Sequence, residues 1–397
     1  MPQSGIPRAE SSKQGTRLQA DVVMALSPDE KFMSMALRLA KKAEGMTSPN
    51  PLVGAVVVKD AEVIGRGYHR GAGLPHAEIE AFIDAAKRGR SVSGSTLYVT
   101  LEPCCHSGKR TPPCVDAIIE KAVARVVVGC LDLNPEVGGK GVEKLEQAGI
   151  RVTAGVIEER AREINEHFFK YITTSTPFVT LKLASTLDGK IATLTGDSKW
   201  IGSPEQRSRA HALRAASDAV AVGIGTVLRD NPRLNVRLPR SNAHQPRPVV
   251  LDSKLRIPLE AALLVIHDSP IIATTQGADR DKALRLEARG ARVVVVEKDG
   301  EGRVDWGHLL AELGKMEVMS VLIEGGASVA ASALAKGVVD KVAIFFSPRL
   351  VGGDGLSMIG PMGIREVKDS LGIYNVKVTA FGKEFVVEGY LSRGASG

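Results

Sequence analysis

The chain has 397 residues, of which 44% are hydrophobic and 24% charged, which is typical of a folded protein with more than one domain and excludes a disordered or fibrous chain. Its net charge is +7, but the basic residues are dispersed and have acidic neighbours, which favours a solvated surface, or small anions such as phosphates, over nucleic acid. With no apolar run of a signal peptide and no stretch of membrane-spanning length, we expect a cytoplasmic protein.

The first half alternates between predicted helices and strands. After a tail over 1–26 that we expect to be disordered, Ser27, Pro28 and Glu30 form a capping box for a helix that ends near Gly45. The elements that follow are a β-hairpin over 52–69, helices over 76–89, 112–123, 141–149 and 157–174, and strands over 95–103, 124–130 and 150–156. This alternation predicts a layered α/β domain over 27–173 with a largely parallel sheet.

The second half has the same class of pattern without repeating the sequence, and we place the domain boundary around 173–178. Its predicted strands cover 178–186, 219–225, 247–253, 270–275, 291–297, 320–326 and 341–348. Helices are expected between them, among others over 203–218 and 327–337. The closing segment, 376–391, predicts an antiparallel hairpin at a sheet edge.

His76 and Glu78 precede a group of cysteines that includes Cys104 and Cys114. All the cysteines fall within one short stretch, which favours a metal site in a reducing compartment over a disulfide framework. A catalytic zinc has three protein ligands and one open position for water, and His76, Cys104 and Cys114 are the best set. Two helix starts would flank the strand end that delivers Cys104. Glu78 would carry the proton of the zinc-activated water to a leaving amine.

Other interpretations of this region stay open. A closed structural zinc site would use Cys105 or His106 as the fourth ligand and would have no need of the nearby carboxylate. Cys130 follows an apolar run, so we expect an unreactive core cysteine there. Asn50 lies between two prolines and, from the residues alone, is equally well explained as a turn asparagine.

The second half lacks a dinucleotide-binding fingerprint, because GIGTVL supplies two glycines and then departs from the pattern. It contains SVLIEGGASVAASAL, in which a strand, a glycine pair ending at Gly326 and a helix follow one another. This arrangement suits a phosphate and a tight packing turn equally. Glu324 ends the strand, where a buried carboxylate needs a ligand or a partner. Arg214 and Arg237 are suited to a sugar phosphate.

The order of the motifs resembles a known family. H-x-E with a later pair of cysteines is similar to the zinc nucleobase deaminases, although residues 105–113 separate the cysteines where that pattern has two residues. SPNPLVGAVVV, HAE, TLEPC and RTPPC resemble the deaminase half of the bifunctional riboflavin-biosynthesis deaminase/reductase family, whose cysteine loop is long; Lys109 or Arg110 is an addition here. KLASTLDGKIAT, GDSKWI, LRAASDAVAVGIGTVLRDNPRLNVR and LIEGGAS resemble its reductase half.

This resemblance implies an α/β chain with a cytidine-deaminase-like three-layer domain and, over 178–397, a dihydrofolate-reductase-like domain. It implies zinc in the first domain and NADPH in the second. The residues expected to contact NADPH are Ala184, Trp200, Thr226, Asp230, Ser253 and Gly326. Those expected to contact the pyrimidine substrates are Asn50, Ser198, Arg214, Leu234, Arg237 and Glu324. From the residues alone, Trp200 is about equally well explained as a core residue, and Asp230 as a helix-cap or turn residue.

We therefore expect a zinc-dependent deamination of a phosphorylated diaminopyrimidinone, followed by NADPH-dependent reduction of its ribosyl side chain. One alternative is a nucleoside or tRNA base deaminase with a non-catalytic RNA-binding second half, which predicts clustered basic and aromatic residues that the sequence lacks. Another is a zinc-stabilised scaffold, and activity in one half alone also stays open. The expected partners are small phosphorylated pyrimidines and further copies of the chain, with neither nucleic acid nor membrane.

Overall fold

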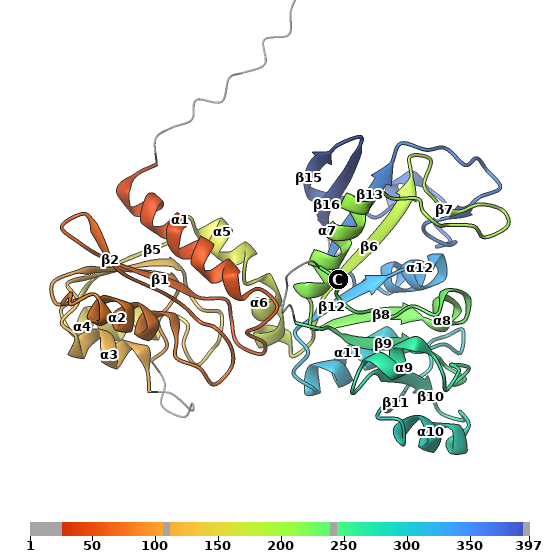
Figure 1. Cartoon of the computed structure of the whole chain (residues 1–397), viewed down its shortest axis with the longest axis horizontal. Coiled ribbons are helices and arrows are strands. Elements are labelled where there is room, and N and C mark those ends of the chain that lie inside the picture. Colours follow the sequence, from red (N-terminus) through yellow and green to blue (C-terminus); the bar gives the residue numbers. More distant parts are fainter. Residues whose placement is uncertain (1–25, 106–111, 239–243, 392–397) are drawn as a thin grey trace, which may run out of the picture.

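The computed structural model describes residues 26–105, 112–238 and 244–391. Two separate large sheets are built from the two halves of the chain, and a small two-stranded sheet accompanies the second. Figure 1 shows the first half, in red to yellow, beside the second half, in green to blue. Apart from Leu26, the tail predicted over 1–26 lies outside the described residues, as do the cysteine-loop residues 106–111.

The first sheet joins five strands in the order β2-β1-β3-β4-β5. They are β1 (Gly54–Lys59), β2 (Glu62–Tyr68), β3 (Thr96–Leu101), β4 (Arg125–Cys130) and β5 (Arg151–Ala154). The predicted hairpin is confirmed, and so is the parallel pairing of the alternating strands β3, β4 and β5, whereas β1 is antiparallel to both β2 and β3. Asp60 and Ala61, both with positive φ, form the turn that reverses the chain and brings the hairpin into the sheet.

Helices cover both faces of this sheet. They are α1 (Pro28–Ala40), α2 (Ala77–Lys87), α3 (Cys114–Glu120), α4 (Lys140–Gln147), α5 (Glu158–Glu163) and α6 (Glu166–Thr174), with a 3-10 turn, η1 (Lys41–Ala43). Alternate residues of the strands point to opposite sides: Val57 packs with α2 and α3, whereas Val56 packs with α1 and α6. The three-layer α/β class is confirmed, and so is the capping box of Ser27 and Glu30.

The single helix predicted over 157–174 is broken into α5 and α6 at Asn165. The side chain of Asn165 accepts a hydrogen bond from Leu52 N at 2.8 Å and donates one to Leu52 O at 3.0 Å. An asparagine that bonds to the backbone of another segment competes with the continuing helix. The two hydrogen bonds at the break hold Leu52, just before β1, against the helical layer.

The second sheet has the order β11-β10-β9-β8-β12-β6-β13-β16-β15. Its strands are β6 (Phe178–Thr186), β8 (Ala219–Gly223), β9 (Arg247–Leu251), β10 (Ile271–Thr275), β11 (Arg292–Val296), β12 (Ser320–Glu324), β13 (Lys341–Ser347), β15 (Ile373–Phe381) and β16 (Glu384–Leu391). All neighbours from β11 to β13 are parallel, whereas β16 is antiparallel to β13 and β15. The predicted closing hairpin at a sheet edge is confirmed.

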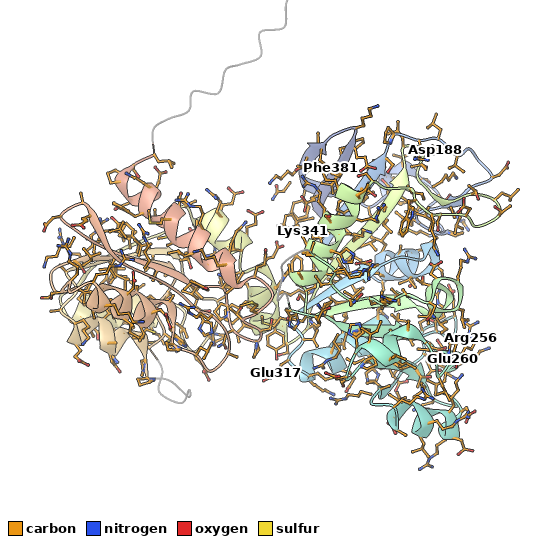
Figure 2. All side chains as sticks on the ribbon, in the orientation of Figure 1. Asp188, Arg256, Glu260, Glu317, Lys341 and Phe381 are labelled. Carbon is orange, nitrogen blue, oxygen red and sulfur yellow. The ribbon has the colours of Figure 1, made fainter. Side chains whose placement is uncertain are left out.

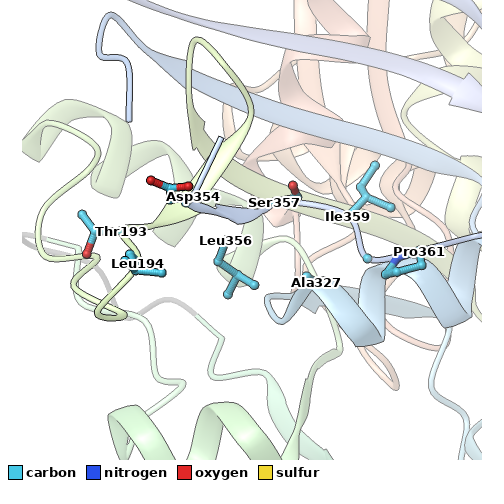
Figure 3. A pocket seen from close by; sticks show the side chains of 10 residues that line it. Thr193, Leu194, Ala327, Asp354, Leu356, Ser357, Ile359 and Pro361 are labelled. Carbon is cyan, nitrogen blue, oxygen red and sulfur yellow. The ribbon is translucent and has the colours of Figure 1, made fainter. Parts of the chain in front are cut away.

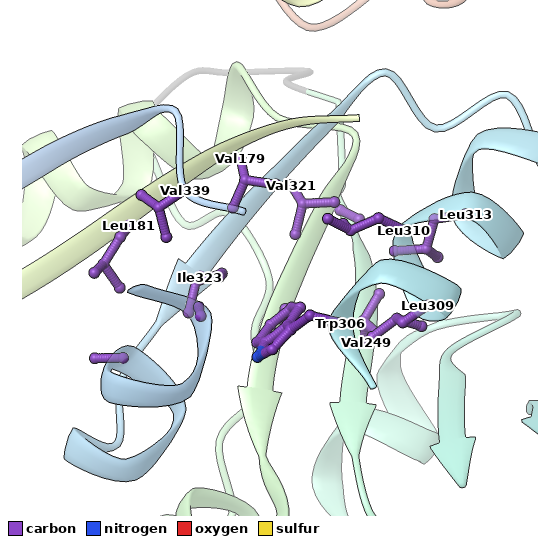
Figure 4. Packing of buried hydrophobic residues seen from close by; sticks show 14 of the residues in the cluster. Val179, Leu181, Val249, Trp306, Leu309, Leu310, Leu313, Val321, Ile323 and Val339 are labelled. Carbon is purple, nitrogen blue, oxygen red and sulfur yellow. The ribbon is translucent and has the colours of Figure 1, made fainter. Parts of the chain in front are cut away.

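The second domain also has helices on both faces. They are α7 (Pro204–Ala215), α8 (Ile224–Asp230), α9 (Ala262–Ile266), α10 (Arg280–Glu287), α11 (Trp306–Lys315) and α12 (Ala327–Ala335), with η2 (Val367–Asp369) and the small sheet of β7 (Lys190–Ala192) and β14 (Leu356–Ser357). The strand predicted over 219–225 is shorter, because Ile224 and Val227 bury side chains at helical spacing in α8. Figure 4 shows Trp306 of α11 packed with Val321 and Ile323 of β12.

Ion pairs join the two domains. Glu166 of α6 pairs with Lys341 of β13 at 2.9 Å and accepts a hydrogen bond from Tyr390 Oη at 2.5 Å. Lys170 of α6 pairs with Asp340, just before β13. Figure 2 labels Lys341 on the side of the second domain that faces the first. These partly buried pairs attach α6 to the end of the second sheet at which its parallel strands begin.

None of the helices within the described part of the chain combines the length and the apolar character that a membrane span requires.

Candidate functional site

The first candidate site lies where two helices begin beside a strand end, as the sequence predicted. His76 is the N-cap residue of α2, and Glu78 lies in the first turn of that helix. Cys114 is the first residue of α3, and Cys104 follows shortly after β3. Among the described residues, His76, Cys104 and Cys114 form a group that could hold a metal ion.

The spacing of the three ligand atoms fits zinc. These atoms all lie within 4.8 Å of one another. His76 Nδ1 is 3.2 Å from Cys114 Sγ and 3.5 Å from Cys104 Sγ. Zinc–ligand bonds of about 2.0–2.3 Å at tetrahedral angles place neighbouring ligand atoms about 3.3–3.8 Å apart. Two thiols and one imidazole are therefore arranged for a tetrahedral ion with a fourth position left for another ligand.

The ionisable groups of the site are strongly perturbed. Burial raises the pKa of Glu78, and the charge of Cys104 raises it further. The hydrogen bond from Cys114 lowers the pKa of Cys104 to about 4, and the same bond is the main reason why the pKa of Cys114 lies well above its ordinary value. A buried carboxyl that favours its protonated form, next to a thiolate, is suited to carrying a proton.

Glu102, in the same TLEPC segment as Cys104, is a structural residue. Its buried carboxylate accepts hydrogen bonds from the backbone N–H groups of Asp132, Gly139, Gly141 and Val142. It thereby joins the end of β3 to the start of α4. Its role was not predicted from the sequence, although a glutamate directly before a proline at the end of an apolar strand was a usable signal.

Asn50 is connected to the metal-ligand group by one intermediate side chain, that of His69. Its Nδ2 atom is 3.0 Å from His69 Nε2, and His69 Nδ1 is 3.1 Å from the carbonyl oxygen of Pro75. With the Nδ1 proton donated to Pro75, His69 Nε2 accepts the hydrogen bond from Asn50. The rings of His69 and His76 meet edge to face, with centroids 5.4 Å apart. His69 was not predicted to belong to the site, although a second histidine close to His76 in the sequence was a usable signal.

The two remaining cysteines lie outside this group. Cys105 is partly buried and packs against the hydrophobic core of α2 and α3. Cys130 is fully buried in the core on the other face, and burial raises its pKa to about 12, so its thiol is the unreactive core group that we expected. His106, the other candidate for a fourth ligand, and the addition at Lys109 or Arg110 lie outside the described residues.

The second candidate site lies along the edge of the second sheet where the parallel strands end. Ala184 is near the end of β6, Thr226 follows β8, Ser253 follows β9 and Gly326 follows β12. Since β6, β8, β9 and β12 are parallel, these four residues share one edge. Ligands of α/β sheets bind beyond the carboxyl ends of the strands.

The glycine turn at this edge is open enough for close approach of a ligand. Gly325 and Gly326 both have positive φ, which favours glycine, and Thr226 Oγ1 lies 3.6 Å from where a Cβ on Gly326 would be. A cavity of about 520 Å³ lies beside this turn, with Ala327 of α12 in its wall. Figure 3 shows Leu356 and Pro361 among its other lining residues. The volume is in the range of small-molecule sites.

Arg214 and Glu324, both expected to contact substrate, contact each other. Arg214 Nε and Nη2 donate to the two Glu324 carboxylate oxygens at 2.6 and 2.7 Å, and Arg214 Nη1 donates to Asn235 O at 3.1 Å. Burial opposes ionisation of Glu324, but Arg214 and Lys182 hold its pKa below the ordinary value on balance. Arg237 lies in the same loop as Asn235 and donates a 2.6 Å hydrogen bond to Asn235 Oδ1.

The other expected contacts are placed less closely. Leu234 has a buried side chain and a positive φ, so its side chain belongs to the core. Trp200 is 65% exposed and lies under the guanidinium of Arg207. It is therefore not a core residue. Ser198 is partly exposed in the preceding loop. Asp230 is the exposed last residue of α8, which agrees with the helix-end position that its sequence also suggested.

Two side chains near this ion pair were missed. Lys182 of β6 lies opposite Glu324 in the strand register, and burial lowers its pKa while Glu324 raises it. Among the described residues, the buried Nδ1 atom of His211 in α7 has no hydrogen-bond partner, and burial followed by the charge of Arg214 lowers the pKa of His211 to about 4. A lysine inside an otherwise apolar strand, and a histidine at helical spacing from Arg214, were usable signals.

Comparison with protein-family models matches both halves of the chain. Residues 26–130 match the cytidine and deoxycytidylate deaminase zinc-binding region. Residues 177–387 match the RibD C-terminal domain. The first match contains the His76 and Cys104 group, and the second contains the whole carboxyl edge described above. Each candidate site therefore falls within a domain of known family.

Similar proteins cover nearly the full length. The riboflavin biosynthesis protein RibD of Aquifex aeolicus is 47% identical over 90% of this chain and 97% of its own, and that of Escherichia coli is 38% identical over 86% and 94%. The structure of Acinetobacter baumannii RibD superposes with a TM-score of 0.82 at 36% identity, covering 92% of this chain and 99% of that one. A Thermotoga maritima diaminohydroxyphosphoribosylaminopyrimidine deaminase/5-amino-6-(5-phosphoribosylamino)uracil reductase gives 0.81 at 39% identity, with the same coverage.

These matches confirm the expected family, fold class and pairing of a zinc-dependent deaminase with an NADPH-dependent reductase, and they do not favour the RNA-binding alternative. The chain belongs to the RibD family of bifunctional riboflavin-biosynthesis enzymes.

Proposed function

We propose that the first domain, over 27–173, hydrolytically deaminates 2,5-diamino-6-(5-phosphoribosylamino)pyrimidin-4-one. The observation that carries this proposal is the His76, Cys104 and Cys114 group with a buried carboxyl, Glu78, beside it. Zinc held by these three side chains supplies an activated water molecule. A closed structural site would have no use for a buried acid next to its ligands.

Glu78 has the role of proton carrier in this proposal. Its raised pKa favours a group that accepts a proton from the attacking water and then donates it to the departing amine. Its place two residues after His76, in the first turn of α2, holds the carboxyl at a fixed distance from the ligands. Asn50, held by His69, would position the pyrimidine ring by hydrogen bonds from its amide.

The second domain, over 178–397, would reduce the ribosyl side chain of the deaminated product to ribityl. NADPH supplies the hydride. Its expected contacts, Ala184, Thr226, Ser253 and Gly326, share the carboxyl edge of the sheet, and the glycine turn offers backbone N–H groups to a phosphate. Trp200 and Asp230 would contact the cofactor from exposed positions outside the strands.

The substrate of the reductase would be held by the charged residues around Glu324. Arg214 and Arg237 are suited to its phosphate, with Ser198 and the backbone at Leu234 completing the expected contacts. Lys182 is a buried cation beside this pair and has a lowered pKa, mainly because of burial. We include it as the group that donates a proton to the ring oxygen as the ribose opens.

The masses of the products test both proposals together. The protein, loaded with zinc, is given the diaminopyrimidinone and NADPH, and the pyrimidines are followed by mass spectrometry. Conversion of one amine to a carbonyl raises the mass by about 1 Da, and addition of two hydrogens raises it by about 2 Da more. A product in which neither change occurs would contradict the proposal.

Two further statements belong to the proposal. The chain assembles with copies of itself, because the edge strand β15 exposes Ile373, Tyr374, Val376 and Val378, and an exposed apolar edge tends to be covered. Light scattering of the purified protein would show a mass above that of one 42.1 kDa chain.

The protein acts in the cytoplasm, where the thiols that bind zinc stay reduced.

A further inference from the structure

The loop of residues 44–51, which carries Asn50, touches the reductase domain as well as its own. It follows η1 and lines a cavity of about 290 Å³ between the two domains. The opposite wall of this cavity includes the last turn of α7 and the start of β12, with Ala216 and Ser320 among its residues. The loop expected to contact the pyrimidine is therefore supported from two sides.

The first contact with the reductase is a close backbone approach. A Cβ atom on Gly45 would lie 1.9 Å from the carbonyl oxygen of Ala215 and 3.0 Å from its carbonyl carbon, both in the last residue of α7. Neither atom belongs to a flexible side chain that could move aside. The loop thus rests directly on the backbone of α7, and only glycine fits at this position.

The second contact is a hydrogen bond to a fixed carboxylate. Ser48 Oγ donates to Asp218 Oδ1 at 2.5 Å. The other oxygen of Asp218 accepts bonds from Met319 N at 2.9 Å and from Ser320 N and Oγ, both at 3.0 Å. Asp218 directly precedes β8, and its partners surround the start of β12. The acceptor for Ser48 is consequently held in place by the reductase sheet itself.

The far end of the loop reaches the metal site. Two residues after Ser48, the Asn50 amide bonds to His69, which in turn bonds to the carbonyl of Pro75, the residue before His76. Leu52 is held on both backbone groups by Asn165 of the deaminase. A short segment thus connects a carboxylate of the reductase to a side chain beside the zinc ligands.

We propose that the reductase domain positions the substrate loop of the deaminase, with Gly45 and Ser48 as its positioning residues. The inference rests on the proposed role of Asn50 in binding the pyrimidine. Loss of either contact lets the loop move away from the metal site, so that the deaminase binds its substrate more weakly while zinc stays bound. Neither Gly45 nor Ser48 is among the residues expected to contact NADPH or the reductase substrate, so the reductase step should be retained.

Gly45→Ala in the full-length, zinc-loaded protein tests the backbone contact. We expect the deaminase KM for the diaminopyrimidinone to rise about tenfold or more, with a much smaller change in kcat, because a 1.9 Å approach forces the loop to shift. The matched control is Gly149→Ala, also in the deaminase: φ is +80° there and +77° at Gly45, and apart from its chain neighbours none of the described residues has an atom within 4 Å of its added Cβ. The control measures the cost of the left-handed backbone alone.

Ser48→Ala tests the hydrogen bond. Loss of a bond to a charged acceptor should raise the deaminase KM about tenfold, and Ser48→Thr, which keeps the hydroxyl, should restore most of it. The control is Ser217→Ala. Ser217 lines the same cavity, but its hydroxyl donates to Leu213 O of α7, within the reductase domain, at 2.8 Å. Zinc content, and the NADPH oxidation rate with the deaminated pyrimidine supplied, are measured for every variant.

The outcomes separate this inference from the function on which it rests. A raised deaminase KM in Gly45→Ala and Ser48→Ala, with normal controls, zinc and reductase rates, supports it. An unchanged KM in both variants overturns it, and so does an equal loss in Gly149→Ala or Ser217→Ala, which would mean a general loss of stability. If the wild-type protein releases no ammonia, the proposed function fails.

Discussion

The two sites of this chain are built in different ways. In the deaminase, the ligand atoms of His76, Cys104 and Cys114 lie within 4.8 Å of one another, and every one of them belongs to a side chain. In the reductase, the principal charged groups, Arg214 and Glu324, are paired with each other, and much of the cofactor edge is backbone at a glycine turn. A metal site is thus specified by a few side chains, whereas a dinucleotide site is specified by the shape of the sheet edge.

The sharpest difference should appear on removal of one ligand. Cys114→Ser should lose zinc and all measurable deamination, because a hydroxyl is a poor substitute for a thiolate ligand. The reductase should still oxidise NADPH when the deaminated pyrimidine is supplied. Metal analysis and both assays are compared with Cys105→Ser, which lies outside the ligand group and should keep its zinc. Loss of zinc in Cys105→Ser would instead support a closed four-ligand site.

Glu78→Gln should separate chemistry from metal binding. The amide keeps the size of the buried side chain but cannot carry the proton, so deamination should fall by about 10³-fold with zinc retained. Glu80→Gln, on the same helix and paired with the exposed Arg70 at 3.5 Å, is the matched control. Ammonia release is measured together with zinc content. An active Glu78→Gln enzyme would mean that another group moves the proton.

Glu324→Gln should impair the reductase and spare the deaminase. Arg214 would keep a buried positive charge without its partner, which should lower the free energy of unfolding by about 3 kcal/mol. NADPH oxidation should fall about 100-fold, whereas ammonia release should be retained. Glu317→Gln, at an exposed position, controls for the loss of a carboxylate. Equal loss of both activities would show that the two domains are not energetically separable.

The smallest effect concerns pH and His211. Its folded-state pKa is about 4, whereas the unfolded chain has about 6.5, so between these values the unfolded state binds more protons. Stability should therefore decrease as the pH falls from 6.5 to 4. His211→Gln should flatten this dependence, measured by denaturant unfolding across that range. An unaltered slope would assign the dependence to other groups.

The sequence predicted the deaminase site more completely than the reductase site. H-x-E and the cysteines predicted the three side chains that the structure brings together, because each one lies at the start of a helix or the end of a strand that periodicity can locate. The residues that hold the site from outside, Glu102 and His69, act through backbone groups of other segments, and no local pattern announces such contacts. The hairpin and the parallel strands β3, β4 and β5 were both predicted, but alternation alone does not show at which strand the hairpin joins the sheet.

In the reductase, the pairing of Arg214 with Glu324 could not be predicted, because 110 residues separate the two side chains along the chain. The sequence pattern predicted that a buried Glu324 needs a partner, but it did not identify which residue that partner is. The buried side chain of Leu234 follows from a positive φ in an irregular loop, which propensities do not predict for leucine.

The most direct test of two consecutive reactions on one chain is an order-of-addition assay. The diaminopyrimidinone is made in situ from GTP with a GTP cyclohydrolase II, and ammonia release by the zinc-loaded protein is followed before and after NADPH is added. We predict ammonia without NADPH, and NADPH oxidation only after ammonia has been released. NADPH oxidation that precedes ammonia release, or the absence of both signals, would contradict the account.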